Sequence, residues 1–181
     1  EITKNLIKKI KQPVDNNYEK DASSPKYVKD EILGIIPSNL KKPFDIRELV
    51  KRFVDRSEFI EFKENYGRTM FCCWTKINGY PIGVIANNGV IFIESARKAT
   101  HFIQLANKSN TPLLFIHNTT GFMVGKRYEQ NGMINSGSQL IHAVSGSTVP
   151  HISLQVSNLY DTGNYAMCGR FFNTRNLYSY Q

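Results

Sequence analysis

Apolar residues recur along this chain with two periods, and each period predicts a different kind of element. Up to residue 62 they lie three or four positions apart, as on one face of a helix. This spacing predicts a helix over residues 2–12, a second helix capped by Asp45, and a short third helix capped by Ser57 and ended by Gly67. The predicted buried positions are Ile46, Leu49, Val50, Phe53 and Val54 in the second helix, and Phe59, Ile60 and Phe62 in the third.

Beyond residue 67 the pattern changes to apolar runs separated by turn residues. Two Asn-Gly pairs, Asn78-Gly79 and Asn88-Gly89, each lie between apolar runs, which is the strongest short-range signal for a β-hairpin. The sequence therefore predicts two successive hairpins between residues 68 and 93.

Helical stretches then alternate with apolar strands. Helices are predicted over residues 95–108 and 133–145, and strands over residues 112–118 and 150–156. Both strands are nearly uninterrupted apolar runs, as expected in a parallel sheet that is covered on both faces. The order hairpin, helix, strand, helix, strand predicts an α/β layered domain with right-handed crossovers.

The net charge of +8 is spread along the chain. Residues 1–52 contain 12 Lys and Arg against 8 Asp and Glu, which is half of the excess, and the other half is scattered. Nucleic-acid-binding domains gather basic residues on one surface, so this distribution argues against a nucleic-acid partner. No run of 18 apolar residues occurs, and no membrane association is predicted.

The three cysteines do not form a disulfide or zinc-binding pattern. Cys72 and Cys73 are adjacent, Cys168 is distant, and no CxxC pair is present. The sequence therefore predicts a reducing compartment and no metal site.

The ends of the chain suggest a fragment of a longer protein. It begins at Glu1 without Met and stops at Gln181 within a polar and aromatic run. Residues 1–12 are expected to end something upstream, the polar residues 13–34 to form a linker, and residues 35–181 to belong to the α/β domain that follows.

Two unusual segments follow the predicted parallel strands. HNTTGFMVGKRYEQNG (residues 117–132) carries three glycines, a Lys-Arg pair and one Phe that is expected to face outward, and SNLYDTGNYAMCGR (residues 157–170) leads into a short helix. Glycine allows a ligand to approach the backbone closely, and helix N-termini present free N–H donors. Two such turns at one sheet edge suit the binding of an oxyanion or a carbonyl oxygen.

No nucleophile, acid/base pair or phosphate loop is evident. Ser145 and Ser147 have His142 and His151 nearby in sequence, but no GxSxG elbow is present. His101 and His142 lie in predicted helices and suit structural roles, whereas His117 and His151 flank strands and could be structural or functional. Glu94 and Glu129 form no recognisable pair, and GFMVGK lacks the GxxxxGK[ST] spacing. A site built on backbone donors fits chemistry that a cofactor carries.

These residues resemble a known family. The segments PFDIRELVKRFVDRSEFIEF, TPLLFIHNTTGFMVG and GNYAMCGR are similar, in order and spacing, to the carboxyltransferase (beta) subunit of biotin-dependent acyl-CoA carboxylases, and most similar to the methylcrotonoyl-CoA type. The resemblance extends from about residue 35 to residue 170. It implies a crotonase-like fold, a layered ββα superhelix of which this chain holds part of one domain.

The resemblance also implies an activity. The expected reaction moves a carboxyl group from carboxybiotin to an acyl-CoA, here 3-methylcrotonoyl-CoA in leucine degradation. Biotin would be carried on a biotin carboxylase/biotin carrier subunit, no metal is implied in this chain, and the family's full-length subunits form homo-hexamers. The implied location is the mitochondrial matrix in a eukaryote and the cytoplasm otherwise, and this chain alone is expected to be inactive.

Site residues are implied position by position. Gly121, Phe122, Val124 and Gly125 would line the biotin pocket. Thr162 and Gly163 would supply backbone N–H donors to the oxyanion, while Asn164 and Tyr165 would contact the acyl-CoA.

One segment departs from the family pattern, which resembles GGSYGAGNYGMCGR. Here Ser157, Asn158 and Asp161 stand where glycines are expected, Thr162 replaces alanine and Ala166 replaces glycine. A lost glycine with positive φ costs about 1–2 kcal/mol, and a lost oxyanion donor lowers the rate roughly 10²–10³-fold. The alternative interpretations are a catalytically impaired homologue with a structural or assembly role, and a relative that decarboxylates acyl-CoA.

Overall fold

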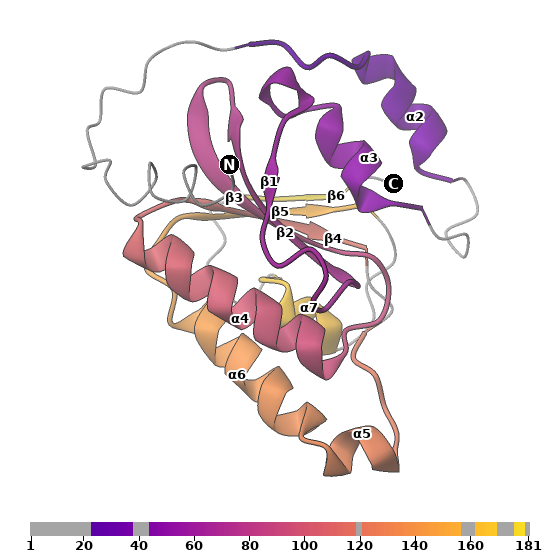
Figure 1. Cartoon of the computed structure of the whole chain (residues 1–181), viewed down its shortest axis with the longest axis vertical. Coiled ribbons are helices and arrows are strands. Elements are labelled where there is room, and N and C mark those ends of the chain that lie inside the picture. The colour runs from indigo at the N-terminus through magenta and orange to yellow at the C-terminus, as the bar shows by residue number, and fades with distance from the viewer. Residues whose placement is uncertain (1–22, 38–43, 119–120, 157–161, 170–175, 180–181) are drawn as a thin grey trace.

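The computed structural model describes residues 23–37, 44–118, 121–156, 162–169 and 176–179. A six-stranded sheet with the order β1-β2-β3-β4-β5-β6 forms its centre (Figure 1). The strands are β1 (Ile60–Glu61), β2 (Met70–Ile77), β3 (Tyr80–Asn87), β4 (Leu113–His117), β5 (His151–Gln155) and β6 (Asn176–Ser179). The first three strands pair antiparallel and the last four parallel, which confirms the predicted α/β architecture.

Helices lie on both faces of this sheet (Figure 1). They are α2 (Ile32–Ile35), α3 (Ile46–Lys51), α4 (Ile93–Lys108), α5 (Lys126–Gln130), α6 (Met133–Ser145) and α7 (Thr162–Ala166), with 3-10 turns η1 (Lys29–Glu31) and η2 (Asp55–Ser57). The predicted helices at 95–108 and 133–145 correspond to α4 and α6. The helix predicted over residues 2–12 lies outside the described residues.

The first predicted hairpin is confirmed. Asn78 and Gly79 join β2 to β3 with φ of 50° and 81°, the positive values that a type I′ turn requires at both central residues. The Asp55 carboxylate accepts hydrogen bonds from both backbone N–H groups, at 2.8 and 2.7 Å. A side chain 23 residues away thus fixes the turn.

The second predicted hairpin, at Asn88-Gly89, is wrong. β3 already pairs with β2 on one side and β4 on the other, so no edge remains for a returning strand. The chain instead continues past Gly89, and Ile91 forms a parallel bridge with Phe122. The apolar run at residues 90–93 therefore leads into α4 rather than into a strand of the sheet.

The short helix predicted after Ser57 is also wrong, whereas the helix after Asp45 is confirmed. The Asp45 side chain accepts from the N–H of Arg47 at 3.0 Å, as an N-cap does. After Ser57, however, Ile60 and Glu61 form β1 on the edge of β2, opposite Trp74 and Cys73. Ser57 has a φ of 56°, and pairing with an open sheet edge prevails over the local helical spacing.

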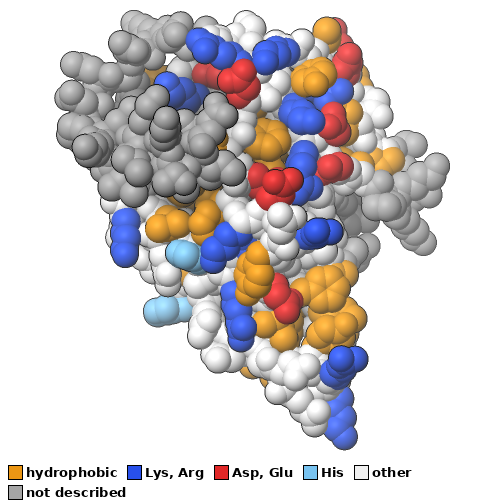
Figure 2. Space-filling view, viewed as in Figure 1, with side chains coloured by type: hydrophobic (Ala, Val, Ile, Leu, Met, Phe, Trp, Pro, Cys, Tyr) orange, Lys and Arg blue, Asp and Glu red, His pale blue; other side chains and the backbone are white. Residues whose placement is uncertain are grey.

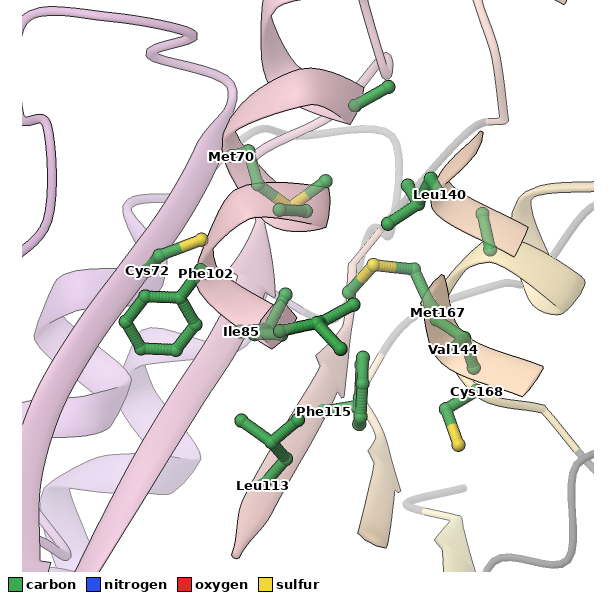
Figure 3. Packing of buried hydrophobic residues seen from close by; sticks show 14 of the residues in the cluster. Met70, Cys72, Ile85, Phe102, Leu113, Phe115, Leu140, Val144, Met167 and Cys168 are labelled. Atoms are coloured by element: carbon green, nitrogen blue, oxygen red, sulfur yellow. The ribbon is translucent and has the colours of Figure 1, made fainter. Parts of the chain in front are cut away.

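The two faces of the sheet bury separate hydrophobic clusters. In β4, Leu113 and Phe115 point to the face covered by α4 and α6, and Leu114 and Ile116 point to the other face, against α3. Figure 3 shows the first cluster, with Phe115 and Leu113 between the side chains of β2 and those of α6. Both faces are covered, which explains the apolar run Leu113–Ile116 in β4.

Four elements, β6, α5, η1 and α2, lie where the sequence pattern predicted no helix or strand. β6 is too close to the end of the chain to show a period, and α5 lies inside the long segment after β4. η1 and most of α2 fall within the predicted linker at residues 13–34. Among the described residues, no helix has the length and apolar character needed to cross a membrane.

Charged side chains are interspersed on the face shown in Figure 2, where Lys and Arg alternate with Asp and Glu. Several are paired. Arg47 Nη2 lies 2.8 Å from Glu61 Oε1, and Arg52 Nη2 lies 2.9 Å from Glu31 Oε2. Some basic side chains of the described residues therefore have an acidic partner.

Candidate functional site

The two unusual segments leave the sheet at the same edge. β4 and β5 are adjacent and parallel, and His117 at the end of β4 lies opposite Gln155 at the end of β5. Ligands of open α/β sheets bind beyond these carboxyl ends. The register thus confirms the prediction that the segments after β4 and β5 start side by side.

The segment after β4 is tied to the segment after β3 by main-chain hydrogen bonds. The Asn87 side chain accepts from the N–H of Asn118 at 2.8 Å. Ile91 donates to the carbonyl of Gly121 and accepts from the N–H of Met123, both at 2.9 Å. The described part of this loop therefore forms a short ribbon with the strand-like residues before α4.

Two glycines on this ribbon have backbone conformations that other residues avoid. Gly121 has a φ of 109° and Gly125 a φ of 130°. A Cβ built on Gly125 would meet, among the described residues, a single atom within 4 Å, Tyr128 Cδ2 at 3.9 Å. Backbone conformation rather than crowding therefore requires glycine at position 125.

Two apolar side chains of the ribbon lie differently from each other. Val124 is 77% exposed. Phe122 was expected to face outward, but it is partly buried and packs on the hydrophobic cluster beneath α6. Its ring lies over Gly137, where the absence of a side chain leaves room for it. The outward orientation predicted for Phe122 is therefore wrong.

The segment after β5 contains α7, a single helical turn. Gly163 and Ala166 are buried, and Tyr165 is 38% exposed. The N–H of Met167 donates to the carbonyl of Gly163 at 3.2 Å, which closes the turn. Of Thr162 and Asn164 only the backbone is described, and Ser157, Asn158 and Asp161 lie outside the described residues.

A series of hydrogen-bonded polar side chains, buried at Cys168 and His151 and partly buried at Ser147 and Asn107, leads from the end of α7 to the end of α4. Cys168 Sγ lies 3.2 Å from His151 Nδ1, and His151 Nε2 lies 2.8 Å from Ser147 Oγ. Ser147 Oγ donates to Asn107 Oδ1 at 2.8 Å, so it must accept from His151, which in turn accepts from the Cys168 thiol. Burial raises the pKa of Cys168 to about 12, and the thiol stays protonated at neutral pH. These hydrogen-bonded side chains therefore have a structural role, and the Cys168 thiol is not a nucleophile.

His117 lies in the same buried region. It is fully buried, and burial lowers its pKa to about 4, with a smaller opposing contribution from the Met167 main chain. Its imidazole is therefore neutral at physiological pH.

The profile of the Carboxyl transferase domain matches residues 1–181. This chain belongs to the carboxyl transferase family.

Relatives in the carboxyl transferase family differ in their named substrates. The chain is 53% identical over 159 residues to a probable biotin-dependent acyl-coenzyme A carboxylase beta2 subunit of Mycobacterium tuberculosis, covering 87% of the chain and 30% of that protein. It is 46% identical over 177 residues to the mitochondrial methylcrotonoyl-CoA carboxylase beta chain of Dictyostelium discoideum, covering 98% and 30%. The crystal structure of the geranyl-CoA carboxylase beta subunit of P. aeruginosa superposes with a TM-score of 0.86 at 46% identity, covering 88% and 31%.

These comparisons confirm the family and the crotonase-like fold that the motifs implied. The chain spans about 30% of the length of the relatives it matches. Most of a carboxyl transferase subunit therefore lies beyond the elements described above.

The residues expected in the site come from the two segments that follow β4 and β5, and α7 lies on the face of the sheet that α4 and α6 cover (Figure 1). Gly121, Phe122, Val124 and Gly125 follow β4, and Thr162 to Tyr165 follow β5. Sequence reasoning overlooked Ser153, whose hydroxyl donates to the Cys168 carbonyl at 2.7 Å. The available signal was the polar residue Ser153 between the two apolar residues Ile152 and Leu154. Within the described residues, no group of three or more His, Cys, Asp or Glu side chains could hold a metal ion.

Proposed function

We propose that this chain forms the biotin-side part of a carboxyltransferase (beta) subunit that transfers a carboxyl group from biotin to 3-methylcrotonoyl-CoA. The observation that carries this proposal is the match of the whole chain to the Carboxyl transferase domain. The 46% identity to a methylcrotonoyl-CoA carboxylase beta chain supports the choice of acyl-CoA. In this proposal residues 1–12 end the upstream domain, residues 13–34 link the domains and residues 35–181 begin the biotin-side domain.

The ribbon after β4 is the proposed biotin contact. Gly125 presents exposed backbone and Val124 an exposed apolar side chain, while Gly121 is buried where the ribbon pairs with Ile91. Phe122 holds the ribbon from below, because its ring is packed over α6. Such a surface fits a compact, uncharged bicyclic ring, since backbone groups can approach the ring closely and apolar atoms can cover its sides. Biotin, bound covalently to a partner subunit, would supply the carboxyl group.

The turn at α7 is the proposed oxyanion site. The backbone N–H groups of Thr162 and Gly163 are in the first turn, where helical N–H groups have no carbonyl partner within the helix. Donors placed before the reaction stabilise the negative charge that develops on an acyl-CoA carbonyl oxygen. Asn164 and Tyr165 would contact the acyl group, and the 38% exposure of Tyr165 supports its access to a ligand.

The proposed partners follow from the same assignment. They are a biotin carboxylase/biotin carrier subunit, an acyl-CoA and further copies of the subunit in a hexamer. A location in the mitochondrial matrix is proposed for a eukaryotic source, as in the name of the Dictyostelium relative, and the cytoplasm for a bacterial one.

A second candidate is a catalytically impaired homologue that retains the fold for assembly. The replacement of expected glycines by Ser157, Asn158 and Asp161 favours it. Asp161 in particular adds a carboxylate next to the proposed oxyanion donors, where negative charge opposes the reaction.

The test is carboxylation by the intact subunit together with its biotin-bearing partner. Carboxylation of 3-methylcrotonoyl-CoA faster than of geranyl-CoA supports the proposal, and the reverse preference changes the substrate. If the wild type does not carboxylate either substrate and the Asp161→Gly variant does, the defect lies in the altered turn. If both proteins are silent but still assemble with the partner, the structural role stands in place of the enzymatic one.

A further inference from the structure

His117 and Ser153 project from neighbouring strands toward α7. In β4, Leu113, Phe115 and His117 alternate onto the face that carries the cluster with Met167 and Cys168. Ser153 lies opposite Phe115 in the β4–β5 register, so its side chain is on the same face. These two polar side chains thus share a face with Leu113, Phe115 and the buried His151.

Each of these side chains is buried beside a main-chain group at the C-terminal end of α7. Ser153 is fully buried, and its hydroxyl donates to the carbonyl of Cys168 at 2.7 Å. His117 is fully buried, and neither ring nitrogen has a hydrogen-bond partner among the described residues. The Met167 main chain favours the protonated ring. A group with this effect must be an acceptor, which is the carbonyl of Met167 rather than its N–H.

A buried imidazole without a hydrogen-bond partner destabilises the folded state. A buried polar group without a partner costs about 1–3 kcal/mol. The nearby carbonyl of Met167 would satisfy one ring N–H after a small shift of the turn. Cys168, the next residue, has a φ of 60°, which a non-glycine residue adopts only when its surroundings impose it.

We propose that His117 and Ser153 are positioning residues that fix α7 for catalysis: Ser153 holds the carbonyl of Cys168 through its hydroxyl, and the buried His117 ring supports the Met167 main chain from the neighbouring strand. The link to the proposed donors is short, because the N–H of Met167 closes the α7 turn on the carbonyl of Gly163. Holding the last residues of a single turn from below fixes the direction of the N–H groups at its beginning. This inference rests on the proposed function for its effect on rate, but its structural part does not.

The test uses the intact subunit with its biotin-bearing partner and two independent readouts. The first is hydrogen exchange, by mass spectrometry, of the peptide that contains residues 162–168. The second is the kcat and the KM for acyl-CoA in the carboxylation assay. The variants are His117→Leu and Ser153→Ala, which remove the donors, and His117→Gln, which keeps an N–H donor. Ser145→Ala is the matched control, since its hydroxyl also donates to a carbonyl, that of His142 at 3.1 Å, but on α6.

We expect His117→Leu and Ser153→Ala to exchange about tenfold faster in this peptide. Their kcat should fall about tenfold with KM within twofold, because misplaced donors weaken the transition state more than binding. His117→Gln should stay within threefold of wild type, and Ser145→Ala should match it.

Two results overturn the inference. One is exchange in Ser153→Ala and His117→Leu equal to wild type, and the other is an equal loss in His117→Gln and His117→Leu. If the leucine variant does not fold, Ser153→Ala and His117→Gln decide the question. A wild type without carboxylation refutes the proposed function alone, and the exchange data still decide whether the positioning role holds.

Discussion

The ring of Phe122 lies directly over Gly137, so that the ribbon after β4 is seated on α6. A Cβ built on Gly137 would be 3.4 Å from Cε1 and 3.6 Å from Cζ of Phe122. This distance is at the limit of ordinary contact, so α6 has room for a ring and for little else. The relationship connects a helix on one face of the sheet to the ribbon proposed to contact biotin.

The effect of a substitution at Gly137 on stability and on the carboxylation rate should therefore depend on the size of the new side chain. We expect Gly137→Ala to raise the free energy of unfolding by up to about 1 kcal/mol, because glycine inside a helix is less stable than alanine. Gly137→Leu should displace the Phe122 ring, lower stability by about 1–3 kcal/mol and slow carboxylation. Thermal unfolding and the carboxylation rate measure both effects. Equal stability of the two variants would contradict this packing.

Gly83 is predicted to tolerate no side chain. A Cβ there would be 2.9 Å from Leu113 Cδ2 and 3.1 Å from ring atoms of Phe102 and Trp74. We expect Gly83→Ala to lower the free energy of unfolding by about 1–3 kcal/mol through overpacking. Gly34→Ala in α2 is the control, since no described atom lies within 4 Å of its Cβ, and it should not destabilise the protein. Denaturant unfolding compares the two variants, and equal unfolding midpoints for Gly83→Ala and Gly34→Ala would contradict the prediction.

At Gly125 the expected cost is conformational. With a φ of 130° and Tyr128 Cδ2 3.9 Å away, an alanine would meet strain but no clash. We expect Gly125→Ala to lose about 1–2 kcal/mol of stability or to shift the ribbon, and to slow carboxylation. Val124→Ala, at a 77% exposed position, should change stability by less than about 0.5 kcal/mol. A Gly125→Ala protein as stable and as active as wild type would argue against a fixed ribbon.

Stability should fall in mild acid because of His117. Its pKa is lowered to about 4 by burial, below the value of 6.5 that the imidazole has when unfolded. The unfolded chain therefore binds the proton first, so stability is complete above pH 6.5 and is lost as the pH falls toward 4. The difference between these two pKa values corresponds to a loss of about 3 kcal/mol of unfolding free energy once His117 is protonated in both states.

His117→Gln tests this origin. Burial lowers the pKa of His101 and His151 in the same direction, so part of the acid sensitivity should remain in the variant. Urea unfolding between pH 4 and 7 should give a shallower dependence in His117→Gln than in wild type. Identical slopes would show that His117 is not the group that titrates.

Glu61 forms ion pairs with Arg47 and Lys98, and the two pairs should contribute unequally to the free energy of unfolding. Its carboxylate accepts from Arg47 Nη2 and Nε at 2.8 and 2.9 Å, whereas Lys98 Nζ is 3.6 Å away, fully buried and without a hydrogen bond among the described residues. We expect Glu61→Gln to lower stability by about 3 kcal/mol, because it leaves the buried Lys98 ammonium uncompensated and removes the ion pair with Arg47. Lys98→Met should leave stability unchanged or raise it, because Arg47 still pairs with Glu61. A large loss in Lys98→Met, measured by denaturant unfolding, would reverse this ranking.

The sequence alone determined the parts of the fold that local pattern specifies. The helical stripes of α4 and α6, the apolar runs of β4 and β5 and the Asn78-Gly79 turn carry their own signals, since propensity and burial agree there. The motifs around residues 112–125 and 163–170 also identified the family, because they are specific in order and spacing.

Tertiary structure decided what depends on the neighbour of each segment. Asn88-Gly89 has the sequence of a hairpin turn, but β4 occupies the edge of β3 that a returning strand would need. Residues 60–61 have helical spacing but lie on the free edge of β2, and Phe122 finds the space over Gly137. Nothing in the sequence distinguishes His117 and Ser153 from other residues of their strands. Only the pairing of β4 with β5 brings both side chains to the face that carries α7. Contacts between segments far apart in sequence fix these features, and local patterns do not record such contacts.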